Sequence, residues 1–153
     1  MTQLFICHRL LQHDQDVSAQ RTPLRVGNFL GLLVQVIGVQ SEAAPAAYQS
    51  WKAGRRVEAP MTTFAEGLAT RAPFEMPQAI LRRDLDDFVL VGDDEIRAAM
   101  RLAIEKTRNL VEGAGAASLA AARKIRDRLQ GKRAVLVLSG GNVTLAGLRE
   151  LLI

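Results

Sequence analysis

The chain has 153 residues, of which 48% are hydrophobic and 24% are charged, so it is long enough to bury the core of one globular domain. The net charge of +4 raises the question of a nucleic-acid partner. However, acidic residues are interspersed among the basic ones, as in 123–127, and one Trp and one Tyr offer little surface for stacking on bases. A solvated basic helix face is therefore expected instead. The single cysteine, Cys7, excludes an internal disulfide and indicates a reducing cytoplasm, while no signal peptide is evident and the longest apolar stretch, 28–39, is too short to span a bilayer.

The pattern changes at about residue 34. Residues 1–33 show no clean period of two or 3.6 and are expected to be irregular. Residues 34–39 alternate little and are mostly apolar, which indicates a buried strand. A helix is expected over 43–53, with Pro45 in its first turn and Gly54 as its stop.

The middle of the chain predicts a helix and a second strand. Residues 74–83 have a helical pattern in which Met76, Ile80 and Leu81 are expected to face inward. Residues 88–91, Phe-Val-Leu-Val, are expected to form a short strand.

Two helices are predicted next. Residues 92–95, Gly-Asp-Asp-Glu, open the first, because acidic side chains interact favourably with the positive end of the helix dipole. The second is expected over 115–129, with Gly131 as its terminator. Its small residues suggest close packing on a neighbour, and these are Ala116, Ala117, Ala120 and Ala121.

The last twenty residues carry the strongest functional signal. The apolar run 134–138 reads as a buried strand that stops at Ser139-Gly140-Gly141-Asn142 and leads into a helical pattern of leucines. Ligands of parallel sheets bind at the carboxyl ends of strands, and glycines there allow close approach to the backbone. A candidate site is therefore placed at Ser139, and a plain strand-to-helix turn is the alternative.

Five short motifs occur in one order and resemble a known family. Strands separated by helices already indicate an α/β fold with a parallel sheet. The sequence predicts only three or four strands, which is few for a complete sheet of this class. The motifs are Val-Ile-Gly-Val-Gln at 36–40, Ala-Glu-Gly-Leu-Ala at 65–69, Gly-Asp-Asp-Glu-Ile at 92–96, Val-Glu-Gly-Ala-Gly-Ala at 111–116 and Leu-Ser-Gly-Gly-Asn at 138–142. Over 34–153 the chain resembles the C-terminal half of the pyridoxal-phosphate-dependent threonine/serine dehydratases, whose tryptophan-synthase-β-like family includes serine racemases.

The resemblance implies a fold, a cofactor and a reaction. The fold is a partial three-layer parallel sheet of the tryptophan-synthase-β-like type, incomplete in this chain. The cofactor is pyridoxal phosphate, an electron sink, and the reaction is β-elimination of a hydroxy amino acid to a 2-oxo acid and ammonia. Ser139 matches the serine that hydrogen-bonds the pyridine nitrogen, and 140–142 match the rest of that loop. Glu112 matches an acidic residue near the cofactor, with a surface carboxylate as the alternative, and Gly67 matches a glycine that borders the cofactor.

The chain also departs from the family pattern. Glu66 stands where the family has aspartate, and Gln40 and Ala46 stand where metal-binding members carry carboxylates, so no metal site is expected. The Ser-x-Lys motif of the family's N-terminal half is expected to be missing, because all four lysines of the chain lie in predicted helices or at a helix end. The Gly-rich phosphate loop is missing as well, because 25–31 hold only two isolated glycines. The four lysines, expected to be solvated at the surface, are Lys52, Lys106, Lys124 and Lys132.

These departures lead to an expectation about the whole chain. Residues 1–33 are expected to be a non-family segment of a truncated or frame-disrupted dehydratase, and 34–153 the C-terminal part of its catalytic domain. The chain alone is expected to be inactive. The alternative is a non-catalytic remnant or partner subunit of the same family. An amino-acid substrate and homo-oligomers are implied by the resemblance, whereas nucleic-acid and membrane partners are not.

Overall fold

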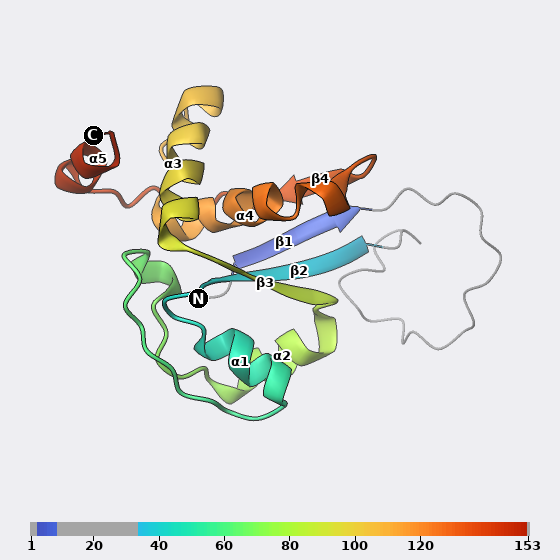
Figure 1. The fold of residues 1–153 in the computed structure, drawn as a ribbon. Helices are drawn as coiled ribbons and strands as arrows, with labels where there is room; N and C mark the ends of the chain where they lie inside the picture. Colours follow the sequence, from blue (N-terminus) through green and yellow to red (C-terminus); the bar gives the residue numbers. More distant parts are fainter. Residues whose placement is uncertain (1–2, 9–33, 153) are drawn as a thin grey trace.

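A four-stranded sheet forms the centre of the protein. The computed structural model describes residues 3–8 and 34–152, with the side chains of the latter range. The sheet order is β3-β2-β1-β4, in which β2 and β3 are parallel and β1 is antiparallel to both of its neighbours (Figure 1). The strands are β1 (Gln3–His8), β2 (Val34–Ser41), β3 (Asp87–Val91) and β4 (Arg133–Leu136), and the helices are α1 (Ala46–Ala53), α2 (Glu75–Asp84), α3 (Asp93–Thr107), α4 (Gly113–Lys124) and α5 (Leu145–Leu152).

Helices cover both faces of the sheet and make three layers. Because side chains alternate along a strand, Ile37 and Val39 of β2 face α3 and α4, whereas Val36 faces α1 and α2 together with Phe88 of β3. The expected α/β class and the strands over 34–39 and 88–91 are therefore confirmed. β1 was not predicted, because its segment has no clean period.

The core between α3 and α4 depends on small side chains. The four alanines expected to pack closely, Ala116, Ala117, Ala120 and Ala121, are at most 2% exposed. The α3 residues Ile96, Ala99, Met100 and Ala103 are also buried. Helix α4 itself ends at Lys124, and a 3₁₀ turn over Arg126–Leu129 replaces the last turn of the expected helix. No helix among residues 34–152 is long and apolar enough to cross a bilayer.

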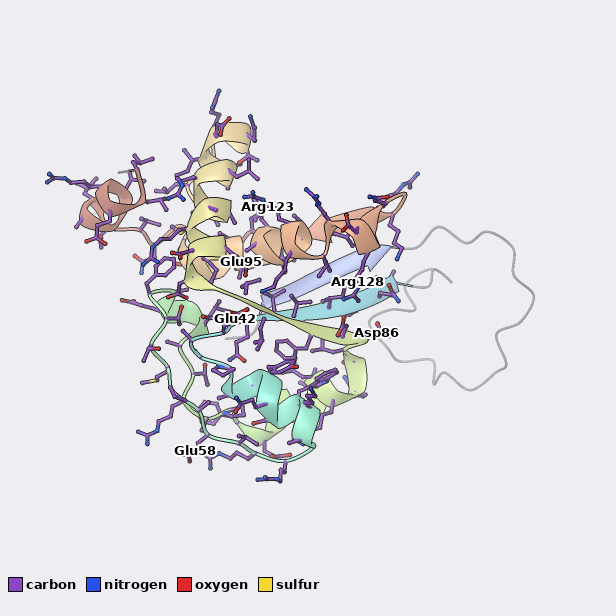
Figure 2. The ribbon with its side chains drawn as sticks, viewed as in Figure 1. Glu42, Glu58, Asp86, Glu95, Arg123 and Arg128 are labelled. Carbon is purple, nitrogen blue, oxygen red and sulfur yellow. The ribbon has the colours of Figure 1, made fainter. Side chains whose placement is uncertain are left out.

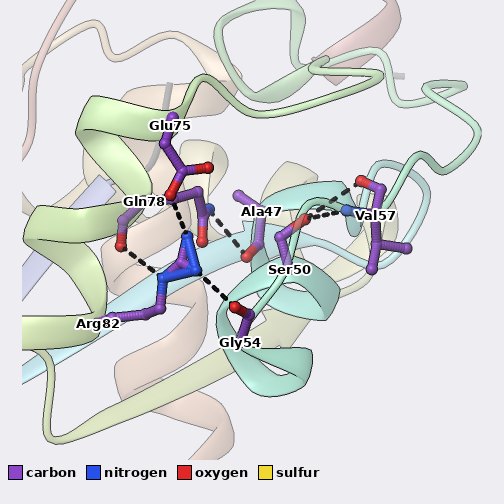
Figure 3. A network of polar contacts seen from close by, with 7 residues as sticks. All are labelled: Ala47, Ser50, Gly54, Val57, Glu75, Gln78 and Arg82. Carbon is purple, nitrogen blue, oxygen red and sulfur yellow. Dashed lines mark hydrogen bonds and ion pairs between the residues drawn. The ribbon is translucent and has the colours of Figure 1, made fainter.

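Helix α2 packs only in part through the expected face, since Leu81 lies against the cluster that contains Val36 and Phe88 but Met76 and Ile80 do not pack inward. Met76 and Ile80 are 70% and 43% exposed, and Gln78 is buried. The Gln78 side-chain amide donates to the Ala47 carbonyl of α1 at 3.1 Å, and Arg82 donates to the Gly54 carbonyl at 2.9 Å (Figure 3). Residues two positions from Gln78 lie on the opposite side of a helix, so this polar contact with α1 turns Met76 and Ile80 to solvent.

The strand expected to be buried over 134–138 lies at the sheet edge. Val135 is 54% exposed and Val137 37% exposed, while Leu136 packs on the core beside α4. Of the strands that the structure describes, β4 pairs only with β1, and α1 and α2 cover the sheet beside β2 and β3 (Figure 1). The prediction of burial was therefore wrong, because among the described residues no helix packs on the second face of β4.

Asp93 ties three separate segments together at the start of α3. Its carboxylate accepts hydrogen bonds from the Ser41 hydroxyl at 3.1 Å, the Thr63 hydroxyl at 2.6 Å and the Phe64 backbone amide at 3.1 Å. The helix start is also closed by Glu95, whose carboxylate accepts from the Gly92 amide at 2.8 Å. The end of β2 and the segment 63–64 are thus held against α3.

Replacing Asp93 by alanine is expected to lower the free energy of unfolding by about 2 kcal/mol or more, because three donors lose a charged acceptor. Asp94→Ala is the matched control, since Asp94 is fully exposed and makes only a 3.5 Å ion pair with Arg97. That control is expected to cost less than about 1 kcal/mol. Urea denaturation of both variants measures the difference, and equal losses would show that the Asp93 contacts do not stabilise the fold.

Candidate functional site

The Ser139–Asn142 turn lies across the first turn of α4. The Glu112 backbone amide, at the N-terminal cap of the helix, donates to the Gly140 carbonyl at 3.1 Å. The Glu112 carboxylate accepts from the Asn142 amide at 3.3 Å. One residue therefore binds the turn through both its backbone and its side chain.

Glycines make this contact possible. A Cβ atom on Gly115 would collide with the Ser139 carbonyl, so the helix must lack a side chain where the turn crosses it. Gly140 has a φ of 75°, and a Cβ atom there would also meet the Glu112 carboxylate. Both positions require glycine for the packing of the protein on itself.

The segment that contains Gly67 also approaches Glu112. Gly67 belongs to a short 3₁₀ helix, Glu66–Leu68, and a Cβ atom on it would lie 2.7 Å from the Ala114 Cβ and 3.8 Å from the Glu112 carboxylate. The structure thus brings Gly67, Glu112, Gly140 and Asn142 together, although they are far apart in the sequence. Gly141 lies beside the Leu110 carbonyl.

A cavity of about 410 Å³ opens where these segments meet. Its lining includes Glu66, Gly67, Glu112 and Asn142, while Ser139, Gly140 and Gly141 lie outside its lining. Its other charged residues, Arg97 and Glu150, were not singled out in the sequence, because only tertiary contacts bring α3 and α5 to this point. The Arg97 guanidinium stacks over the Phe64 ring, 4.1 Å from its centroid.

The cavity fits pyridoxal phosphate only in part. Glu66, Glu112 and Glu150 give it three carboxylates against the single guanidinium of Arg97, so an anionic phosphate would be repelled. All four lysines are in the described part of the chain, and none of them lines the cavity. The residues that line the cavity thus include no lysine amine for attachment of the cofactor, and their carboxylates outnumber their one guanidinium.

Lys124 is held between two carboxylates instead of being freely solvated. Its ammonium donates to Glu42 at 2.8 Å and to Glu95 at 3.0 Å, and Figure 2 labels these two acids, which follow the end of β2 and begin α3 respectively. Partial burial lowers the pKa of Lys124, but the hydrogen bonds and charges of the two carboxylates outweigh this and raise the pKa above its usual value. Lys124 is thus a protonated structural cation.

The positions considered for a metal have other contacts. The Gln40 side-chain oxygen accepts from the Tyr48 amide at 3.0 Å, and Glu42 is engaged by Lys124. Within 34–152, no group of three or more His, Cys, Asp or Glu side chains is arranged to hold a metal ion. The sequence also places Cys7 and His8 side by side with His13 five residues on, and these three residues lie outside the side chains that the structure describes.

Known proteins resemble this chain over most of its length. The family model described as pyridoxal-phosphate dependent enzyme matches residues 22–140. The chain is 45% identical over 113 residues to L-threonine ammonia-lyase of Geobacter sulfurreducens. The aligned region covers 72% of this chain and 28% of that protein.

Solved structures give the same result. Threonine deaminase isoform 2 of Solanum lycopersicum superposes with a TM-score of 0.68 at 30% identity, over 75% of this chain and 34% of the other. Serine racemase of Dictyostelium discoideum gives 0.67 at 30% identity, over 74% and 36%. The chain thus spans about a third of the length of these relatives.

Lys124→Met is expected to destabilise the protein by leaving Glu42 and Glu95 without their shared cation. Because folding raises the pKa of Lys124, its stabilisation is fully present below the unfolded pKa of 10.5 and is lost as pH rises through the folded value. Chemical denaturation should therefore show a constant difference from wild type between about pH 7 and pH 9 that shrinks in stronger base. Lys106→Met, which removes an exposed pair with Glu105, is the control. A Lys124→Met effect that persists unchanged in strong base would mean that its charge is not the cause.

Proposed function

This chain belongs to the pyridoxal-phosphate-dependent enzyme family, and on that premise we propose that residues 34–153 form the C-terminal wall of a cofactor site in the threonine/serine dehydratase lineage. The observation that carries the proposal is the pair of Glu112 contacts to Gly140 and Asn142, which holds the Ser139 turn against α4. The names of the similar proteins, a threonine ammonia-lyase and a threonine deaminase, support the choice of reaction class.

Each expected residue has a role in this proposal. The Ser139 hydroxyl faces the pyridine nitrogen of pyridoxal phosphate, Gly140 and Gly141 let the ring approach the backbone, and Asn142 orients the turn. Glu112 fixes the turn in place, and Gly67 borders the ring on the opposite side. Bound pyridoxal phosphate supplies the electron sink that β-elimination requires.

The 153 residues alone are proposed to be non-catalytic. The supporting observation is that no lysine among residues 34–152 lines the cavity that contains Glu112. The second candidate is therefore a non-catalytic partner subunit of the same family. The proposal extends to a threonine- or serine-type substrate, to homo-oligomers and to a cytoplasmic location, the last suggested by the single Cys7.

The test is calorimetric titration with pyridoxal phosphate alongside an assay for 2-oxo acid release from L-threonine and L-serine. Weak cofactor binding without oxo-acid release is expected. Ser139→Ala should weaken binding by about tenfold through loss of one hydrogen bond. Thr62→Ala, an exposed hydroxyl outside the cavity, should leave binding unchanged.

Two results would contradict the proposal. Oxo-acid release by the chain alone, abolished in Ser139→Ala, would show that one of its own lysines completes the site. A folded chain that binds no pyridoxal phosphate would show that residues 34–153 do not form a wall of a cofactor site.

A further inference from the structure

Beyond β4, the chain passes from the edge of the sheet onto helix α4. The pairing of β4 with β1 ends at Leu136. One residue later, the Val137 carbonyl accepts a hydrogen bond from the Ser118 hydroxyl of α4 at 2.9 Å. Ser118 thus holds the chain at the point where the strand pairing stops, two residues before Ser139.

The contacts that α4 makes with this segment follow one another along the helix. Ser118 binds the start of the segment 137–142, and Glu112 binds its end. Between them, Gly115 leaves room for the Ser139 carbonyl. Because residues three apart are neighbours on a helix surface, these three positions attach the segment step by step to one rigid element.

Ser118 is a hydroxyl residue in a run of small apolar ones. It is fully buried, as are Ala117 and Ala121. Serine is less favourable than alanine inside a helix, and a hydroxyl withdrawn from water costs free energy unless it is hydrogen-bonded. Serines in helices commonly donate to a carbonyl of the preceding turn, whereas Ser118 donates to Val137. The side chain therefore links α4 to the segment that carries Ser139.

The segment needs such a link because the strand before it has one exposed face. Val135 is 54% exposed on β4. A slip of one residue in the pairing of a strand sends every side chain to the opposite face. The bond from Ser118 opposes such a slip, since it specifies which carbonyl of the segment faces α4.

We propose that Ser118 is a positioning residue, whose bond to Val137 sets the place of Ser139 so that the Ser139 hydroxyl meets the pyridine nitrogen of bound pyridoxal phosphate. Ser118 acts through the backbone, and it is not among the residues that line the cavity. The inference rests on the proposed function, in which Ser139 contacts that nitrogen. Without Ser118, the Glu112 contacts with the end of the turn remain, so the loss falls on the contact that Ser139 makes.

The test compares two compounds by calorimetric titration of the full chain: pyridoxal phosphate and its analogue in which carbon replaces the ring nitrogen. The wild-type chain should bind pyridoxal phosphate about tenfold more tightly than the analogue, which corresponds to one hydrogen bond. Ser118→Ala should reduce this preference to about twofold, with the affinity for the analogue unchanged. Ser139→Ala should remove the preference, and Ser118→Ala added to it should cause no further loss.

Ser50→Ala is the matched control. Ser50 is also fully buried, and its hydroxyl also joins a helix to the backbone of another segment, at Val57 (Figure 3). It belongs to α1 and does not line the cavity. Ser50→Ala should therefore keep the tenfold preference of the wild type. Alanine favours helix and fits the space of a serine, so both variants are expected to fold.

Amide hydrogen exchange without any cofactor measures the restraint itself. If Ser118 positions the turn, the amides of 139–142 should exchange about fivefold faster in Ser118→Ala than in the wild type, the equivalent of about one hydrogen bond. In Ser50→Ala the exchange of 139–142 should not change.

Loss of the preference in Ser118→Ala, together with faster exchange at 139–142, supports the inference. Equal loss of affinity for the two compounds would show a merely structural role and overturn it, as would unchanged exchange in the turn. A preference that Ser139→Ala removes and Ser118→Ala keeps would overturn the inference alone. A wild-type chain without any preference would contradict the contact of Ser139 with the nitrogen, and with it both the proposed function and the inference.

Discussion

The close approach of the Ser139 carbonyl to the first turn of α4 is the contact on which the candidate site depends. It requires glycine at position 115 and places Glu112 where its backbone and side chain both bind the turn. Because α4 also packs its alanine face against α3 and the sheet, the turn is attached to the most buried helix of the protein. The position of the turn is thus set by the core rather than by the exposed strand that precedes it.

The charge of the site limits what this wall can do. Three carboxylates line the cavity. Lys124 lies outside that lining, where Glu42 and Glu95 hold its ammonium group. Releasing Lys124 would leave those two acids facing each other. The described residues that line the cavity therefore carry more negative than positive charge.

Much of the fold could be predicted from the sequence, because local patterns determine it. The strands β2 and β3, the acidic start of α3 and the small-residue face of α4 were all confirmed. On α2, Leu81 packs inward as predicted, whereas Met76 and Ile80 are exposed, since Gln78 is the residue that faces α1 and bonds to it. The burial of β4 was wrong because periodicity does not show whether a neighbouring layer covers a strand. Arg97 and the Asp93 contacts could not be predicted, as they join segments that are distant in sequence. The cofactor roles of Ser139, Gly140, Gly141, Asn142, Glu112 and Gly67 stay predictions.

Amide hydrogen exchange of the purified chain, with and without pyridoxal phosphate, tests the central claim most directly. If the wall holds the cofactor ring, exchange should slow at 139–142 and at 112–115, and should not change at 55–62, which lie outside the cavity. Unchanged exchange in the turn at saturating cofactor, or protection confined to another part of the chain, would contradict the account.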